Sequence, residues 1–318
     1  METAWDCIVV GAGAAGLSAA LVLGRARRRT LVIDAGGQSN RVAHGVGGLL
    51  TNDGRPPADL YAAGRREIGA YPTVELRHAE VVRGERDDER FVLELADGTR
   101  ETARRVLLAT GMDYRYPALP GIAERWGRSV FHCPFCHGWE VRDRRLGVLD
   151  GSAKGVHRAT LLRAWSDDVT LLTDGPATLE HEDRDALRAA GVAVDERSAV
   201  GLRGADATLE AVVFADGSER RLGGLLVPVT LHQRSALARQ LGAALTVGPL
   251  STETVEVDAK LATTVPGLWA AGDLSAPMPS VANAIAAGSS AAAMVVQSLM
   301  APMPQLATVG DGHADARR

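Results

Sequence analysis

The stretch Cys133-Pro134-Phe135-Cys136 holds two of the three cysteines in the chain, and His132 and His137 flank it. Two thiols separated by two residues can close into a disulfide and open again. A neighbouring imidazolium or a helix N-terminus lowers a thiol pKa from about 8.5 to about 3.5–7.5, which favours the reactive thiolate. Together with a redox cofactor, this pair would form a redox centre.

Other roles for the two cysteines would need other partners. A structural zinc site requires four ligands. The sequence has no second cysteine pair, and drawing the two adjoining histidines onto one metal would strain a short loop. An inert structural pair is the remaining alternative. We expect a redox dithiol and no metal, and we expect Cys7, on an apolar stretch, to be a small core residue.

A glycine-rich loop near the start of the chain is typical of dinucleotide binding. Gly11, Gly13 and Gly16 separate an apolar stretch at 7–10 from a helical stretch at 17–28, and the next apolar stretch ends in Asp34. The first glycine permits a tight turn, the second admits the pyrophosphate, and the third lets the helix pack on the strand. Free N–H groups at the helix start stabilise the phosphate charge, and the carboxylate can accept the ribose hydroxyls. The loop alone fits FAD or NAD.

Two later segments favour FAD. Leu-Ala-Thr-Gly at 108–111 and Ala-Gly-Asp at 271–273 each place small residues at the end of an apolar stretch, where backbone can approach a ligand closely. An extended FAD needs several such approaches, and Asp273 could accept a hydrogen bond from the ribityl chain.

The composition is that of an ordinary globular protein. The 318 residues suffice for two domains with substantial cores, and the net charge is −4. Arginines alternate with acids, as at 83–88, so we expect no nucleic-acid or membrane surface. Three cysteines favour a reducing compartment, and the glycine-broken N-terminal apolar run is no signal peptide. We expect a cytoplasmic protein with a mobile tail at about 302–318.

The order of strands and turns suggests two domains of related design. Residues 91–99 are echoed at 211–218, and in both copies an apolar strand begins eight residues after the glycine. Strands at 146–149 and 169–173, with a helix at 156–164 between them, form a second strand–turn–helix–strand unit. A strand before 271–273 and a helix at 280–300 then return to the first domain.

We therefore expect an α/β protein with two Rossmann-like, three-layer ββα domains. The FAD-binding domain comprises residues 1–116 and 240–318. It is split in sequence by an inserted NAD(P)-binding-like domain at 117–239, which carries the cysteine pair.

These motifs occur together in a known family. The glycine loop, Gly36-Gly37-Gln38, the Ala109-Thr110-Gly111 turn, the cysteine pair and the segment at 266–273 resemble the low-molecular-weight thioredoxin reductase group of flavoproteins, in order over residues 5 to about 300. The resemblance implies a homodimer in which the split domain holds FAD and the dithiol lies over the flavin. The residues expected at the FAD site are Gly11, Gly13, Ala14, Gly16, Asp34, Gly37, Gln38, Asn40, Thr110, Gly111, Gly272, Asp273 and Val281.

The resemblance also implies separate roles for the two cysteines. Cys136 would lie against the flavin as the charge-transfer thiolate, and Cys133 would exchange with the substrate. Thioredoxin reductases usually carry an aspartate after the second cysteine, whereas this chain has His137. Near neutral pH a histidine can take a proton from an incoming thiol. We expect His137 and His132 to join the two cysteines in catalysis, with a capping or packing role as the alternative for each histidine.

The second glycine loop of thioredoxin reductases, which binds NADPH, corresponds here to residues 150–155 and has lost two glycines. Asp150 and Ser152 replace them. A carboxylate about 4 Å from a phosphate charge costs about 1 kcal/mol in water and about 4 kcal/mol at an effective dielectric of about 20, and Lys154 could offset part of this. The next strand is followed by Asp174, whereas NADPH-dependent members of the family usually have an arginine-rich segment there to hold the 2′-phosphate. We expect the nicotinamide site to be lost, although the acid leaves NADH binding open.

With FAD and a dithiol but no nicotinamide site, electrons must come from elsewhere. Residues 133–140 resemble the thioredoxin-reductase-like dithiol oxidases of disulfide natural product biosynthesis, such as those for gliotoxin and holomycin. The resemblance implies FAD-dependent oxidation of a small-molecule dithiol to a disulfide by the Cys133–Cys136 pair, with the flavin reoxidised by O₂ to give H₂O₂. An NAD(P)H-dependent thioredoxin or disulfide reductase stays open as an alternative, as does a non-turnover flavoprotein that acts as a sensor or interaction protein.

Overall fold

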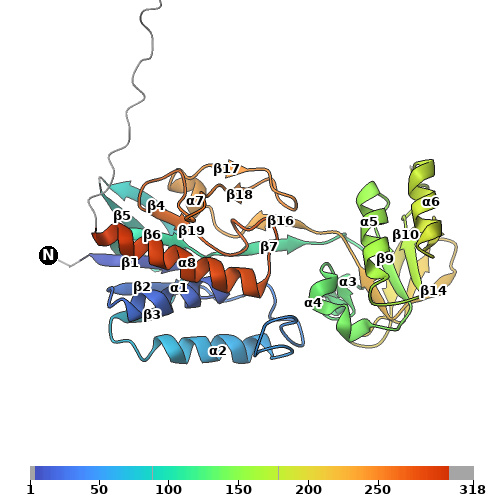
Figure 1. Cartoon of the computed structure of the whole chain (residues 1–318), viewed down its shortest axis with the longest axis horizontal. Coiled ribbons are helices and arrows are strands. Elements are labelled where there is room, and N and C mark those ends of the chain that lie inside the picture. The colour runs from blue at the N-terminus through green and yellow to red at the C-terminus, as the bar shows by residue number, and fades with distance from the viewer. Residues whose placement is uncertain (1–3, 88, 178, 301–318) are drawn as a thin grey trace, which may run out of the picture.

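The computed structural model describes residues 4–87, 89–177 and 179–300, and the tail expected at 302–318 lies outside these residues. The chain forms two lobes, joined by a pair of extended strands (Figure 1). Both lobes have a parallel sheet covered by helices on one face and by antiparallel strands on the other. The expected α/β class with two Rossmann-like, three-layer domains is therefore confirmed.

The first lobe is built on a sheet in the order β3-β2-β1-β6-β5-β4, with β19 also paired to β6. Strand β1 runs parallel to β2 and β6, β2 runs parallel to β3, and β19 runs parallel to β6. Strands β4, β5 and β6 form an antiparallel meander. The strands are β1 (Trp5–Val10), β2 (Thr30–Asp34), β3 (Val74–His78), β4 (Val81–Asp87), β5 (Arg90–Leu95), β6 (Arg100–Leu108) and β19 (Leu268–Ala270), with a small pair, β17 (Leu245–Thr246) and β18 (Thr254–Val255).

Alternating residues of β1 build the two cores on the faces of this sheet. Ile8 and Val10 pack with the meander, whereas Cys7 and Val9 pack beneath the helices. Successive side chains of a strand point to opposite faces, so an all-apolar strand buried on both sides is expected here. The helices of the lobe are α1 (Ala14–Arg25), α2 (Pro57–Ile68), α7 (Leu237–Gln240) and α8 (Val281–Met300).

The helix α1 begins and ends three residues earlier than the sequence pattern indicated. It begins directly after the glycine turn, and it stops at Arg25 because Arg27 has a φ of 58°, outside the right-handed helical region. The strand expected at 106 also begins earlier, at Arg100, because its polar first half pairs with β5 across the Asp97-Gly98 turn.

Helix α8 is the one described helix long and apolar enough to span a membrane by length and composition. In this fold its buried side pairs with α1, and Gly288 is the residue at the closest approach. A Cβ there would overlap the backbone of Ala15. Small residues on α8 thus serve helix–helix packing in the core of the lobe.

The second lobe repeats the plan with a five-stranded parallel sheet in the order β11-β10-β9-β15-β8. Helices α5 and α6 pack on one face, and the antiparallel sheet β12-β13-β14 covers the other. Its elements are α3 (Ile122–Arg125), β8 (Val130–Phe131), α4 (Pro134–His137), the 3₁₀ helix η1 (Trp139–Val141), β9 (Leu146–Leu149), α5 (Ala153–Leu162), β10 (Val169–Leu172), α6 (His181–Ala189), β11 (Ala193–Asp195), β12 (Ala199–Arg203), β13 (Ala211–Phe214), β14 (Glu219–Arg221) and β15 (Gly224–Leu226).

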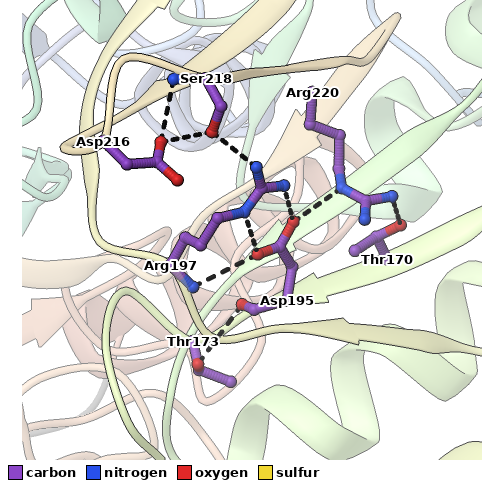
Figure 2. A network of polar contacts seen from close by, with 7 residues as sticks. All are labelled: Thr170, Thr173, Asp195, Arg197, Asp216, Ser218 and Arg220. Carbon is purple, nitrogen blue, oxygen red and sulfur yellow. Dashed lines mark hydrogen bonds and ion pairs between the residues drawn. The ribbon is translucent and has the colours of Figure 1, made fainter.

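A polar network fastens the small antiparallel sheet to the parallel sheet of this lobe (Figure 2). The buried carboxylate of Asp195, at the end of β11, accepts hydrogen bonds from Arg197 and from Arg220 on β14. Arg220 also donates to Thr170 on β10, 3.3 Å away. Hydrogen bonds from Arg197 in particular hold the pKa of Asp195 far below its ordinary value. The network is structural, and its arginines are already paired.

The chain passes between the lobes twice, through β7 (Met112–Arg115) and β16 (Thr230–Gln233). These strands pair antiparallel, with Arg115 opposite Thr230 and Met112 opposite Gln233. The predicted boundaries at 116/117 and 239/240 stay predictions. The first lies directly after β7, and the second falls within α7, six residues beyond the end of β16. Because the strands pair with each other, both crossings between the lobes lie side by side (Figure 1).

Candidate active site

A cavity of about 820 Å³ runs from the glycine loop of the first lobe to the cysteine pair of the second. Most of the residues predicted for the two sites line it together, although their sequence positions span the whole chain. The predicted residues in its lining are Gly11, Gly13, Ala14, Asp34, Gln38, Asn40, Thr110, Gly111, His132, Cys133, Cys136, His137, Gly272, Asp273 and Val281.

Gly16 and Gly37, which were also predicted, are not in this lining. A Cβ on Gly16 would overlap the carbonyl of Gly11, so this glycine allows the close packing of helix and strand that its position in the motif indicates. Gly37 has a φ of +76°, and its carbonyl accepts a hydrogen bond from Arg234. Its contribution is to the shape of the loop after β2.

The glycine loop has the form of a phosphate cradle. Gly11 has a φ of +104°, and Gly13 caps α1 without any side-chain hydrogen bond, so the first amides of the helix face the cavity. The Asp34 carboxylate at the end of β2 accepts a hydrogen bond from the amide of Ala12 at 3.1 Å. Such free amides at a helix N-terminus favour a bound phosphate. These residues fit the pyrophosphate and ribose of a dinucleotide.

A buried donor without a partner supports a bound cofactor at the same place. The side-chain Nε2 of Gln38 is buried beside the cavity and has no hydrogen-bond partner within the described part of the chain. A buried donor left without a partner costs about 1–3 kcal/mol. A ligand oxygen in the cavity would satisfy it, which fits FAD.

Asp273 and Tyr114 meet on the cavity wall, although they are far apart in sequence. The Tyr114 hydroxyl donates to Asp273 Oδ2 at 2.9 Å. Burial raises the pKa of Asp273, and the hydrogen bond from Tyr114 partly opposes that rise. The guanidinium of Arg234 also lines the cavity and acts electrostatically on both groups. This wall combines a carboxylate, a hydroxyl and a cation suited to the polar middle of an extended cofactor.

The cysteine pair forms a disulfide at the start of α4, with the two Cα atoms 5.3 Å apart. The amides of Cys136 and His137 both donate to the carbonyl of Cys133 at 3.2 Å, which holds the turn. The loop after β2 in the first lobe packs directly against it. A Cβ on Gly47 would lie 2.6 Å from the carbonyl oxygen of Cys136. The disulfide is thus held facing the cavity by close contact between the lobes.

The two histidines beside the disulfide have different surroundings. His132 lies between the ring of Tyr114, 5.0 Å away, and that of Trp126, 5.6 Å away. Burial, and then the nearby His137, lowers its pKa to about 4. The pKa of His137 is also lowered by burial, with Glu140 acting in the opposite direction. Both imidazoles are therefore neutral at pH 7, and their burial makes them weaker bases than a free histidine.

His137 is also unpartnered. Both of its ring nitrogens are buried without a geometrically good hydrogen bond in the described chain, although the carbonyls of Gly127 and Cys133 are close enough to raise its pKa somewhat. Its ring stacks on Phe131 at 5.8 Å. The predicted catalytic roles of the two histidines stay predictions.

The second glycine loop contains an anion of its own. The carboxylate of Asp150 accepts hydrogen bonds from the amide and hydroxyl of Ser152 at the start of α5, and forms an ion pair with Arg158. A Cβ on Gly155 would overlap the Asp150 carbonyl, so the helix-packing position of the motif is kept. The cation beside Asp150 is Arg158, one turn beyond the Lys154 that the sequence suggested. The Asp150 carboxylate is thus bonded to the loop itself, at the position where the nucleotide-binding motif has its first glycine.

The acid after the next strand is also structural. Asp174 has a φ of 55°, and its Oδ1 accepts a hydrogen bond from the amide of Ala199 at 2.8 Å. Among the described residues no cluster of three or more histidine, cysteine or acidic side chains is arranged to hold a metal ion.

Sequence reasoning missed several residues that shape the cavity, chiefly Tyr114, Trp126, Arg234 and Gly47. Tyr114 and Arg234 come from the ribbon between the lobes and its continuation. The sequence indicated neither of these elements. Their positions depend on the pairing of β7 with β16, for which the local pattern carried no signal.

Known proteins share this architecture over nearly the whole chain. A crystal structure of HlmI has 38% identity and a TM-score of 0.88, covering 94% of each chain. An oxidoreductase from Agrobacterium tumefaciens has 36% identity and a TM-score of 0.88, covering 94% of this chain and 99% of its own. The curated protein "Thioredoxin reductase tcpT" of Claviceps purpurea is 33% identical, over 94% of this chain and 95% of its own.

The family comparison agrees with these relatives. The pyridine nucleotide-disulphide oxidoreductase model matches residues 5–289, which include the glycine loop, the disulfide and the Gly272-Asp273 wall. A redox-active disulfide facing a dinucleotide cavity is what an enzyme of thiol–disulfide exchange requires. The chain belongs to the pyridine nucleotide-disulphide oxidoreductase family and is a thioredoxin-reductase-like thiol-disulfide oxidoreductase.

Proposed function

We propose that the protein oxidises a small-molecule dithiol to a disulfide through Cys133 and Cys136, with FAD as cofactor and O₂ as final electron acceptor. The observation that carries this proposal is the hydrogen bond that the amide of Ser152 donates to the carboxylate of Asp150. It disfavours a nicotinamide phosphate at the second loop, while the first loop and the disulfide share one cavity. Electrons would therefore enter from a thiol substrate.

The residues that would hold FAD follow from the cavity wall. The α1 N-terminus and Asp34 would bind the pyrophosphate and the ribose, Gln38 would donate to an oxygen of the cofactor, and Asp273 would bind the ribityl chain. Bound FAD would supply a two-electron acceptor that O₂ reoxidises with formation of H₂O₂.

The protein's own part in the reaction is thiol–disulfide exchange. One substrate thiolate attacks Sγ of Cys133, which breaks the Cys133–Cys136 bond and leaves a thiolate on Cys136. The second substrate thiolate then attacks the sulfur of its own molecule in the mixed disulfide, so Cys133 leaves as a thiolate and the substrate departs as a disulfide. Two electrons have moved to the protein cysteines. The two substrate protons need acceptors, and the neutral imidazoles of His132 and His137 are nearby.

The test is turnover in air, with peroxide as the readout. The flavin-loaded protein is mixed with a panel of small dithiols, and peroxide and product disulfide are measured together. We expect one peroxide for each disulfide formed. Failure across the panel, together with rapid bleaching of the flavin by NADH or NADPH without oxygen, would contradict the proposal.

The second candidate is an NAD(P)H-dependent thioredoxin or disulfide reductase. It is favoured by the name of the relative "Thioredoxin reductase tcpT". The same anaerobic experiment separates the two candidates. A reductase is bleached by NAD(P)H, whereas a dithiol oxidase is bleached by its dithiol.

A homodimer and a cytoplasmic location are also part of this proposal, and both come from the family resemblance and the composition. Light scattering after size-exclusion chromatography tests the dimer. A mass near twice the 33.4 kDa of the chain is expected.

A further inference from the structure

The ring of Trp165 packs against the disulfide turn, residues 133–138, from outside the cavity. Trp165 follows α5, and its amide donates to the carbonyl of Leu162 at 3.0 Å. Its side chain is one of the partly buried residues that pack on the apolar core under α5 and α6, and it is not part of the cavity lining. Its contacts with the turn are therefore contacts within the second lobe and do not belong to the cofactor site.

Two residues of the turn, one on either side of Cys136, contact this ring. Phe135 and Trp165 meet edge to face, with their ring centroids 5.4 Å apart. A Cβ on Gly138 would lie 2.8 Å from both Cδ1 and Cγ of Trp165, and 2.5 Å from the carbonyl oxygen of Pro134. Gly138 has right-handed helical angles, φ −63° and ψ −32°, so its lack of a side chain is required by space and not by conformation. The backbone of the turn thus lies directly on the tryptophan ring.

The main chain of Trp165 holds the far end of the same segment. Its carbonyl accepts a hydrogen bond from the amide of Asp143, 2.9 Å away and two residues beyond η1. Within the turn, the amide of Gly138 donates to the carbonyl of Pro134 at 2.7 Å. The segment at 134–143 is therefore fastened by Trp165 at two places, and it cannot uncoil without losing contacts to this one residue.

The shape of this turn matters for the disulfide because the two sulfurs separate when their bond opens. Cys133 precedes the turn with extended angles, φ −122° and ψ 110°, whereas Cys136 lies within it. A turn that keeps its shape holds the two thiols of the reduced protein close together, and this high effective concentration favours the disulfide. A turn that loosens gives the reduced protein more conformations. Reduction of the disulfide then becomes easier.

We propose that Trp165 is a positioning residue that sets the redox equilibrium of the Cys133–Cys136 pair by keeping the disulfide turn closed in the reduced protein. The inference rests on the proposed function, in which this pair takes two electrons from a substrate dithiol. It adds that a residue outside the cavity determines how readily the pair accepts these electrons. Trp165 acts through Phe135 and Gly138, which lie on either side of Cys136.

The experiment measures the equilibrium between the protein disulfide and dithiothreitol. Dithiothreitol loses two electrons and two protons to form its cyclic disulfide, and the Cys133–Cys136 disulfide gains them and becomes two thiols. The flavin-loaded protein is equilibrated without oxygen in mixtures of reduced and oxidised dithiothreitol, quenched with acid, unfolded and alkylated. Intact mass then gives the fraction of protein with two labels beyond the one on Cys7. The measurement requires neither turnover nor peroxide.

We expect Trp165→Ala to raise the equilibrium constant for reduction about tenfold, which corresponds to a reduction potential about 30 mV less negative. Trp165→Leu, which keeps more of the core filled, should shift the constant in the same direction. Trp165→Phe, which keeps an aromatic ring, should return it to within about twofold of the wild type. Trp139→Ala is the matched control and should also stay within about twofold. Trp139 lies in the same segment, but it is 66% exposed and its ring is covered by the guanidinium of Arg142.

Urea unfolding of the oxidised and the reduced protein separates this role from a purely structural one. A residue that only stabilises the fold contributes equally to both redox states, so its loss leaves the redox equilibrium unchanged. If Trp165 favours the disulfide, the disulfide must in turn strengthen the contribution of Trp165, because such coupling is reciprocal. We therefore expect Trp165→Ala to lower the free energy of unfolding more in the oxidised protein than in the reduced protein.

Three results would overturn the proposal. They are an unchanged equilibrium constant in Trp165→Ala and Trp165→Leu, an equal shift in Trp139→Ala, and equal losses of unfolding free energy in the two redox states. If Trp165→Ala does not fold, Trp165→Leu and Trp165→Phe decide the question by the same criteria. Failure to form peroxide from small dithiols, with the expected shifts present, would contradict only the oxidase proposal. Normal peroxide formation with an unchanged constant would contradict only the role of Trp165.

Discussion

The carboxylate of Asp150 accepts a hydrogen bond from the amide of Ser152, 3.0 Å away, at the N-terminus of α5. In a dinucleotide-binding loop this amide would face a cofactor phosphate. The same carboxylate is paired with Arg158, so the charge at the loop is balanced within the protein. The second lobe therefore keeps the Rossmann-like scaffold, with a carboxylate bonded to the amide at the start of its helix.

The double variant Asp150→Gly with Ser152→Gly should restore affinity for a nicotinamide dinucleotide. Removal of the carboxylate ends a repulsion of about 1–4 kcal/mol, and Arg158 becomes free to face a phosphate. We expect the dissociation constant for NADH to fall by at least about tenfold in a calorimetric titration. Lys154→Ala, at an exposed position of the same loop, is the control and should leave the constant unchanged. Equal binding by the wild type and the double variant would show that Asp150 does not block the site.

Cys136→Ser should retain a covalent adduct on Cys133 after reaction with a small linear disulfide. Cys133 attacks one sulfur of that disulfide and the other thiol leaves, and the mixed disulfide persists because neither Cys136 nor a second thiol on the adduct can release it. Intact-mass measurement should show one added mass of the bound thiol, and turnover of a dithiol should fall by more than about a thousandfold. Cys7→Ala is the matched control because Cys7 is buried in the core, where burial raises its thiol pKa. An adduct on Cys136 in the Cys133→Ser variant alone would reverse the assigned roles.

The stability of the protein should decrease in acid in part through His132. Its pKa is about 4 in the folded protein and 6.5 ordinarily, so the unfolded chain binds more protons between these values. The free energy of unfolding must then fall as the pH is lowered from about 6.5 to about 4. Because the ring is only half-buried, we expect this residue to account for a loss of about 2 kcal/mol in the free energy of unfolding over this pH range.

Urea unfolding of His132→Gln at pH 7 and at pH 4.5 measures this contribution. The loss of stability between the two pH values should be smaller than in the wild type by about that amount. His181→Gln is the control, since His181 is exposed on α6. If both variants show the wild-type pH dependence, the pKa of His132 is not lowered in the folded protein.

Tyr114→Phe should weaken retention of FAD. The hydroxyl donates to Asp273 and helps keep its carboxylate ionised against the effect of burial. Without it the pKa of Asp273 rises further, and its carboxylate is no longer held in place. We expect the dissociation constant for FAD, measured by the fluorescence of released flavin, to increase about fivefold. Tyr116→Phe should have little effect, because Tyr116 packs against the ring of Trp126, whereas the hydrogen bond to Asp273 comes from Tyr114. An unchanged constant in Tyr114→Phe would contradict its role.

The parts of the site that could be predicted from sequence are those fixed by local geometry. The glycine turn, Asp34 at the end of β2 and the Gly272-Asp273 turn after β19 each follow a strand directly, so their motif places them at one edge of the sheet. The cysteine pair was likewise recognisable because its chemistry needs only a spacing of three residues. These residues indeed line one cavity.

The residues that escaped prediction depend on contacts between distant segments. Tyr114 reaches Asp273 only because β7 pairs with β16, and Gly47 reaches Cys136 only because the two lobes are in contact. The pairing of Arg158 with Asp150 is local by contrast, eight residues apart in the loop and the first part of α5, and the sequence drew attention to the nearer Lys154 instead. No local pattern encodes the positions of Tyr114 and Gly47, because these are set by the tertiary packing.

The ribbon of β7 and β16 has a consequence for how such a protein can be assembled in evolution. Arg115 and Thr230 are opposite each other in adjacent antiparallel strands, and a turn of two residues is enough to join such strands into a hairpin. Residues 116–229 could thus be exchanged or removed as one inserted unit without a change in the fold of the first lobe. Under the proposed function, such an inserted unit would be retained for the two sulfur atoms of Cys133 and Cys136.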